Sequence, residues 1–175
     1  MKNTTVLALR HNGKTVLASD GQVTLGNTII KHKASKVRKI YDGKILAGFA
    51  GSAADGIALL SRFEGKIKEY KGNLERAAVE LAQEWRTDKA LRGLDAIMIV
   101  ASKEKLFLLS GTGDLLQPDD DVIAIGSGGP YALAAAKALI KHSNLPPEEI
   151  AKEAMEITSS ICIYTNDQIT IEVLE

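Results

Sequence analysis

Two glycine-containing segments of the sequence could bind a phosphate group. Gly13-Lys14-Thr15 matches the end of a phosphate-loop motif, but Ala8 stands where that motif requires its first glycine. The triplet also lies in a predicted hairpin and does not begin a helix, so a cradle of backbone N–H groups cannot form there. Gly126–Gly129 precedes a predicted helix and is the better anion site by geometry. We therefore interpret the first segment as a turn, while the second can be a structural loop or a site.

A basic run between positions 31 and 39 could contact nucleic acid. It comprises Lys31, Lys33, Lys36, Arg38 and Lys39. The whole chain, however, has 22 Lys and Arg against 22 Asp and Glu, a net charge of zero. No aromatic residues alternate with the basic ones, so the run is more typical of a solvated strand edge in which one lysine can still be buried and functional.

The three histidines and the single cysteine do not form a metal site by their spacing. His11, His32 and His142 lack metal-ligand spacing and a paired acid, which favours surface positions. Cys162 is the only cysteine, so neither an intrachain disulfide nor a cysteine-based zinc site can form. Together with the absence of a signal-peptide pattern and of an apolar run of about 20 residues, this predicts a soluble protein of a reducing compartment, the cytoplasm.

Length and composition predict one packed domain. The chain has 175 residues and a hydrophobic content of 45%. A chain of this length buries roughly 70% of its unfolded surface, so it needs neither disulfides nor a metal in order to fold.

Strands dominate the first fifty residues and return after position 94. Asn12-Gly13 supplies the positive φ angles of a hairpin turn between the first two strands. The expected strands are 4–10, 15–19, short pieces around 23 and 29–30, 37–41, 44–50, 95–102, 106–110, 115–117, 122–125 and 168–174.

Four helices are expected between these strands. The first begins after Ser52, which with Asp55 has the spacing of a capping box, and the second begins after Asn73. The apolar face of the first helix comprises Ile57, Leu60, Phe63, Ile67 and Tyr70. Two more helices follow, one over about 131–142 and one that Pro146-Pro147 opens. Strands and helices come in runs, which predicts an α+β fold of two antiparallel sheets covered outside by helix pairs.

Thr4-Thr5 alone is typical of any strand, but its combination with other segments is specific. Those segments are Ser19–Thr24 at the end of the second strand, Lys36 in the basic run and Ala47–Ser52 leading into a helix. Together they resemble the N-terminal nucleophile hydrolases, most closely the bacterial proteasome-like threonine peptidases. The resemblance covers nearly the whole chain from Thr4, with further matching stretches at 20–27, 84–88, 124–132 and 161–166.

Two departures from the family pattern concern packing or surface contacts. Ala18 and Ser19 stand where glycines often precede the Asp-Gly-Gln segment, and Arg10-His11 stands where a pair of arginines is common.

The resemblance implies a four-layer αββα sandwich and a threonine endopeptidase. Thr4 would be the nucleophile once residues 1–3 are removed as a propeptide, because its free α-amine then serves as the base. Lys36 would lie beside Thr4 and be neutralised by Asp20. Ser127 would hydrogen-bond near the amine, and the backbone N–H of Gly48 would stabilise the oxyanion.

The resemblance also implies partners and a cation. The subunit would form a homo-oligomer of two stacked six-membered rings that docks with a hexameric AAA+ ATPase, which feeds it unfolded protein. No nucleotide, nucleic acid or membrane is expected to bind this chain. Ser159, Cys162 and Thr165 are three residues apart at the end of the last helix, where unpaired carbonyls suit a cation, and the resemblance makes sodium the candidate.

Two other functions remain open at this point. One is a catalytically silent ring subunit that acts as a scaffold. The joint presence of Thr4, Asp20, Lys36 and Gly48 argues against it. The other is a nucleotide-binding module built on the Gly126–Pro130 loop.

Overall fold

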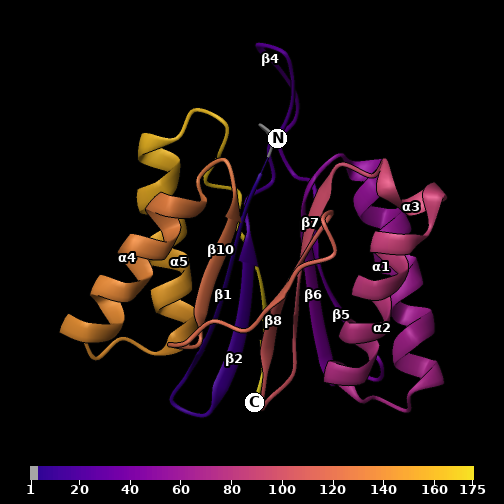
Figure 1. Cartoon of the computed structure of the whole chain (residues 1–175). Coiled ribbons are helices and arrows are strands. Elements are labelled where there is room, and N and C mark those ends of the chain that lie inside the picture. The colour runs from indigo at the N-terminus through magenta and orange to yellow at the C-terminus, as the bar shows by residue number, and fades with distance from the viewer. Residues whose placement is uncertain (1–3) are drawn as a thin grey trace.

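The computed structural model describes residues 4–175 as a four-layer sandwich. Two antiparallel sheets lie face to face in the centre, and a pair of long helices covers the outer face of each (Figure 1). This arrangement confirms the αββα architecture. The predicted removal of residues 1–3 lies outside the described residues.

The first sheet has four strands in the order β10-β1-β2-β11. They are β10 (Val122–Gly126), β1 (Thr5–His11), β2 (Lys14–Ser19) and β11 (Thr170–Leu174). Asn12 and Gly13 join β1 to β2 with φ angles of 50° and 78°, which confirms the predicted turn. Helices α4 (Gly129–His142) and α5 (Pro147–Ile161) cover this sheet.

The second sheet has five strands in the order β5-β6-β7-β8-β9. They are β5 (Val37–Ile40), β6 (Ile45–Gly51), β7 (Ala96–Ala101), β8 (Leu106–Ser110) and β9 (Leu115–Leu116). Helices α1 (Ala53–Glu69) and α2 (Leu74–Thr87) cover it, followed by a short α3 (Lys89–Arg92) that the sequence did not predict. A separate hairpin of β3 (Val23–Leu25) and β4 (Thr28–Lys31) projects from one end of the molecule (Figure 1).

Both predicted helix caps are present. Ser52 Oγ accepts a hydrogen bond from the Asp55 N–H at 3.4 Å, and Asn73 Oδ1 accepts one from the Arg76 N–H at 3.1 Å. Each cap satisfies one of the N–H groups that the first turn of a helix leaves unpaired.

The predicted buried face of α1 was wrong at one residue. Ile57 is 49% exposed, whereas Leu59 is fully buried. The reason lies at Gly56, where a Cβ atom would overlap the ring of Phe49. The helix rests on the sheet at that glycine, so the next residue along the chain is rotated away from the sheet by about 100°.

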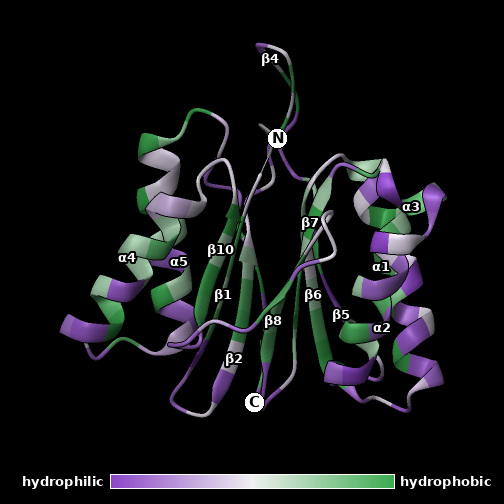
Figure 2. Ribbon diagram, in the orientation of Figure 1, coloured by the Kyte–Doolittle hydropathy of each residue, from purple (hydrophilic) through white to green (hydrophobic). Residues whose placement is uncertain are grey.

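Three hydrophobic cores fill the spaces between the four layers, and the strands and inward helix faces are correspondingly apolar (Figure 2). Val6 and Leu17 belong to the core between the sheets, and Leu7 belongs to the core under α4 and α5. Trp85 is fully buried in the core between the second sheet and its helices. Within residues 4–175, no helix combines the length and the apolar content that crossing a membrane requires.

Candidate active site

Thr4 and Thr5, at the beginning of β1, serve opposite sides of the first sheet. Side chains alternate along a strand, and Val6 packs between the sheets while Leu7 packs under the helices. Thr5 therefore belongs to the helix side, where its Oγ1 lies 2.8 Å from Thr165 Oγ1. Thr4 belongs to the side between the sheets, is fully buried, and makes one long hydrogen bond of 3.5 Å from its Oγ1 to the Gln22 carbonyl.

The glycine loop after β10 holds both threonines. The Ser127 N–H donates to the Thr4 carbonyl at 3.0 Å, and the Gly128 N–H donates to Thr5 Oγ1 at 2.9 Å. Gly126 has a φ of 92°, and a Cβ atom there would overlap the Thr4 carbonyl. Two N–H groups that a phosphate would need are thus bonded to the threonine pair, which removes the geometric basis for a nucleotide-binding module at this loop.

Asp20 organises the backbone around the threonines. Its carboxylate is buried and accepts three N–H donors, from Thr5 at 2.9 Å, Asn166 at 3.1 Å and Gln22 at 3.2 Å. Burial raises the pKa of Asp20, and these three hydrogen bonds and the charge of Lys36 oppose that increase. Asp20 therefore fixes the start of β1 in addition to placing negative charge near Lys36.

Lys36 is the one buried residue of the basic run, with 3% of its surface exposed. Its carbonyl accepts a hydrogen bond from the Phe49 N–H at 3.1 Å, which extends the pairing of β5 with β6. Burial lowers the pKa of the Lys36 ammonium, and the negative charge of Asp20 opposes the decrease. A buried lysine with a lowered pKa is a common feature of active sites.

Gly48 lies inside β6, facing the first sheet. A Cβ atom there would lie 3.0 Å from Val6 and Val37 side-chain atoms and 3.1 Å from one of Leu17. Because N–H directions alternate along a strand and the Phe49 N–H points to β5, the Gly48 N–H points toward β7. Gly51 is the last residue of β6 and has a φ of 114°. Its N–H points to the side on which β5 pairs, but at a level of the sheet that lies before the first residue of β5. The oxyanion role of Gly48 stays a prediction, and Gly51 is a second candidate donor.

Sequence reasoning missed the contribution of the segment after α5 to this site. Asn166 Oδ1 accepts from the Gly21 N–H at 3.0 Å, and its Nδ2 donates to the His32 carbonyl at 2.9 Å. Gln22 Nε2 donates to the Ile163 carbonyl at 2.9 Å. The signal that could have found it is the matching stretch 161–166, to which Ile163 and Asn166 belong.

The three residues predicted to bind sodium lie where α5 ends. Cys162 is the C-cap, and its carbonyl accepts from the Thr165 N–H at 3.1 Å, which leaves it one lone pair for a cation. Ser159 belongs to the last turn of α5, in which carbonyls lack helical partners. Among residues 4–175, no cluster of His, Cys, Asp or Glu could hold a metal ion. Carbonyl oxygens are the kind of ligand that a hard cation takes, and sodium at this site stays a prediction.

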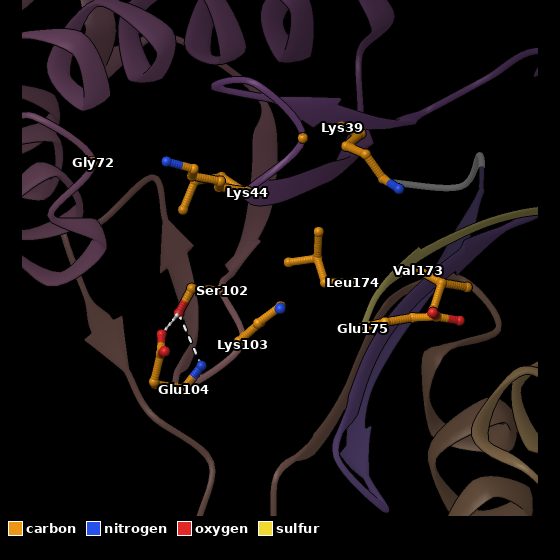
Figure 3. Close-up of a pocket in the computed structure, with 11 residues that line it drawn as sticks. Lys39, Lys44, Gly72, Ser102, Lys103, Glu104, Val173, Leu174 and Glu175 are labelled. Atoms are coloured by element: carbon orange, nitrogen blue, oxygen red, sulfur yellow. Dashed lines mark hydrogen bonds between the residues drawn. The ribbon is translucent and has the colours of Figure 1, made fainter.

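The remaining polar candidates lie away from Thr4. His32 and His142 are exposed and His11 is partly exposed, as predicted. A cavity of about 650 Å³ is lined by Lys39, Lys44 and Lys103 together with the C-terminal residues 173–175 (Figure 3). None of the candidate catalytic residues lines it, and the C-terminus is at the opposite end of the molecule from the β3–β4 hairpin (Figure 1).

Comparisons with known proteins agree with this geometry. The proteasome subunit family matches the chain over residues 1–174. The protein "ATP-dependent protease subunit HslV" of Pseudothermotoga lettingae is 60% identical over 98% of this chain and 97% of its own length. The same-named protein of Syntrophobacter fumaroxidans is 58% identical over 98% of this chain and 96% of its own length. The crystal structure of HslV from Trypanosoma brucei superposes with a TM-score of 0.93 at 47% identity, covering 98% of this chain and 99% of that one.

Proposed function

This chain belongs to the proteasome family, and from that premise we propose that it is the proteolytic subunit of a two-component ATP-dependent protease, a threonine endopeptidase with Thr4 as nucleophile. The observation that carries the assignment is the burial of Thr4 between the sheets, with its backbone held by the Ser127 N–H and by the loop of Gly126. A silent scaffold is not favoured, because the buried Lys36 and Asp20 are costly to retain without a reaction.

The reaction begins with a proton transfer inside one residue. The free α-amine of Thr4, with an ordinary pKa near 8, accepts the hydroxyl proton directly or through a water molecule as Oγ1 attacks the peptide carbonyl. The carbon–nitrogen bond then breaks, the leaving amine takes the proton, and an ester on Thr4 remains. Water hydrolyses that ester, restoring the hydroxyl and releasing the acyl part of the substrate as a carboxylic acid.

Each neighbouring group has a defined electrostatic role. The Lys36 ammonium favours the neutral amine and stabilises negative charge at Oγ1, while Asp20 balances the buried cation. Ser127 hydrogen-bonds near the amine. A backbone N–H at the end of β6 stabilises the oxyanion, a contribution whose loss typically costs about 10²–10³ in rate.

The mechanism requires removal of Met1, Lys2 and Asn3, because an acylated Thr4 nitrogen is an amide and cannot act as a base. Thr4 has a φ of 110°, which is unfavourable for a β-branched residue by about 1–3 kcal/mol. Cleavage before Thr4 abolishes that constraint, since φ is defined by the preceding carbonyl. The Thr4 hydroxyl can attack the Asn3 carbonyl, shift the chain to an ester and release residues 1–3 after hydrolysis by water.

The test pairs two substitutions at Thr4. Thr4→Ala should abolish hydrolysis of a fluorogenic peptide, whereas Thr4→Ser, which keeps a hydroxyl, should retain it. Intact-mass spectrometry should show the parent chain starting at Thr4 and the alanine variant retaining residues 2–3. Undiminished hydrolysis by Thr4→Ala would refute the nucleophile, and a fully active parent that still carries Asn3 would refute the amine as base.

The proposal includes a double ring of two hexamers, located in the cytoplasm, that docks with an HslU-type hexameric AAA+ ATPase. The exposed apolar residues of the β3–β4 hairpin support self-association, because Leu25 is 71% and Ile30 is 60% exposed. The hairpin begins directly after Gln22, whose carbonyl accepts a hydrogen bond from Thr4 Oγ1, so a neighbouring subunit would cover this flank of the site.

Sodium at Ser159, Cys162 and Thr165 is part of the same proposal. Carbonyl oxygens would hold the ion, and its charge would rigidify the segment that ends at Thr165, which contacts Thr5. Thermal unfolding should therefore have a midpoint a few degrees higher in sodium chloride than in choline chloride at the same ionic strength. Equal midpoints in the two salts would remove sodium from the proposal.

A further inference from the structure

Ser19, the residue immediately before Asp20, has a buried hydroxyl without a hydrogen-bond partner in the described part of the chain. Its exposed fraction is 0%, and its Oγ makes no hydrogen bond. Buried hydroxyls in native proteins are nearly always bonded to protein or to ordered water, because desolvation without a bond costs about 1–3 kcal/mol. An unbonded hydroxyl one residue from a catalytic carboxylate therefore points to a bound molecule.

The strand alternation places this hydroxyl between the two sheets. Thr15, four residues earlier on β2, donates from Oγ1 to the Ser102 carbonyl of the facing sheet at 2.9 Å. Leu17 belongs to the core between the sheets. Ser19 is two residues from Leu17 and four residues from Thr15 on the same strand, so its side chain faces the same space.

The strand register brings Ser19 close to Thr4. Ser19 lies opposite Val6 in the β1–β2 ladder, and the Asp20 N–H to Thr5 carbonyl bond extends that ladder by one residue. Thr4 is thus the diagonal neighbour of Ser19 on the same face, at roughly 7–8 Å between backbones. Two side-chain oxygens joined by one water lie up to about 5.6 Å apart, which suits diagonal side chains that extend toward each other.

We propose that Ser19 is a positioning residue whose hydroxyl holds a buried water between itself, the Thr4 hydroxyl and the Lys36 ammonium. A buried water needs two to four polar partners, and Thr4, Ser19 and Lys36 are all buried. Lys36 is close enough to Asp20, the residue after Ser19, for their charges to interact. The water orients the Thr4 hydroxyl and solvates the buried ammonium. The inference rests on the proposed function, since it concerns the same nucleophile.

Two substitutions at Ser19 separate this role from a structural one. Ser19→Ala removes the hydroxyl oxygen, but the remaining methyl group is too close to the vacated oxygen position for a second water to take its place. Ser19→Gly removes both atoms and leaves room for a water to replace the hydroxyl. Glycine in a strand is less stable than alanine, so a purely structural role predicts that the glycine variant is the worse one. The water-holding role predicts the opposite order of activity.

The experiment measures kcat and KM for a fluorogenic peptide together with the thermal midpoint of each variant. Ser19→Ala should lower kcat about tenfold, the equivalent of one lost neutral hydrogen bond, and change KM less than twofold. Ser19→Gly should be at least threefold more active than Ser19→Ala despite a lower midpoint. Thr15→Ala, on the same face of the same strand, should lower the midpoint and leave kcat unchanged.

Three results would overturn the proposal. They are a Ser19→Ala variant with the parent kcat, a glycine variant no better than the alanine variant, and a kcat loss in Thr15→Ala of the same size. A parent chain without hydrolysis would overturn the proposed function and this inference with it. An active parent whose hydrolysis depends on Thr4 but not on Ser19 would overturn this inference alone.

Discussion

Gly128 is a position where the structure predicts a large effect from adding a single methyl group. Its φ of −93° suits any residue, so an alanine there costs nothing in backbone conformation. A Cβ atom would, however, overlap Thr5 Oγ1 and Thr158 Cγ2 and lie 2.9 Å from Thr165 Oγ1. All three threonines are buried, so none can swing into solvent.

The expected destabilisation follows from two contributions. Overpacking a buried site by one methyl costs about 1–3 kcal/mol. Displacing Thr5 also lengthens the 2.9 Å hydrogen bond from the Gly128 N–H, which is worth about 1 kcal/mol. Gly128→Ala should therefore lose about 2–4 kcal/mol of unfolding free energy. Because Thr4 is bonded to Thr5, kcat should fall as well.

Urea denaturation followed by circular dichroism measures the loss, and peptide hydrolysis measures kcat. Gly65→Ala is the matched control, since nothing lies within 4 Å of its Cβ position inside helix α1, and it should gain about 0.5–1 kcal/mol. Thr158→Ser removes Cγ2 and keeps the hydroxyl that bonds the Ala154 carbonyl. In the Gly128→Ala background it should restore part of the stability. A Gly128→Ala protein as stable and active as the parent would refute the packing argument.

Three further predictions concern the surroundings of the site. Asn166→Ala should lose about 1–3 kcal/mol and part of kcat in the same assays, because its side chain bonds Gly21 and His32, while exposed Asp167→Ala should change neither. The pH profile of kcat/KM should fall on the acid side as the Thr4 amine is protonated. The value of kcat/KM should also fall on the alkaline side, below pH 10.5, because burial lowers the pKa of Lys36 and the active ammonium is lost as the pH rises through that pKa. The Lys36→Arg variant should move this alkaline decrease to higher pH, and an unmoved decrease would contradict the assignment. Ile30→Asp should yield smaller assemblies in native mass spectrometry than Thr28→Ala on the same hairpin, and equal assembly of both would contradict an interface there.

Features of the fold that depend on residues close together in the sequence could be predicted from it. The Asn12-Gly13 turn and the caps at Ser52 and Asn73 follow from local chemistry and are present as expected. Ile57 could not be placed, because its exposure depends on the contact of Gly56 with Phe49 across two layers. The spacing of apolar residues defines the apolar face of a helix, but it does not show at which residue of that face the helix touches its sheet.

The candidate site shows the same division between local and distant information. The resemblance placed Asp20 beside Lys36. Burial raises the pKa of Asp20 and lowers the pKa of Lys36, and the attraction between the two charges opposes both shifts. The three N–H donors to Asp20 were not predicted, since one of them comes from Asn166, 146 residues further along the chain. A carboxylate in a sequence shows its charge, but the number of donors around it is a property of the packed layers.

The division of roles between Thr4 and Thr5 is set by the alternation of the strand rather than by residue type. Thr5 faces the helices, where Thr165 and the Gly128 N–H engage its hydroxyl, so it is a poor nucleophile. Thr4 faces the space between the sheets, and within residues 4–175 its hydroxyl makes only a long contact with the Gln22 carbonyl, as the proposed nucleophile requires. A one-residue slip of β1 would exchange these environments, and the bonds that Asp20 and the glycine loop make to the two residues prevent that slip. The residues that fix the register are therefore as necessary to the chemistry as the nucleophile itself.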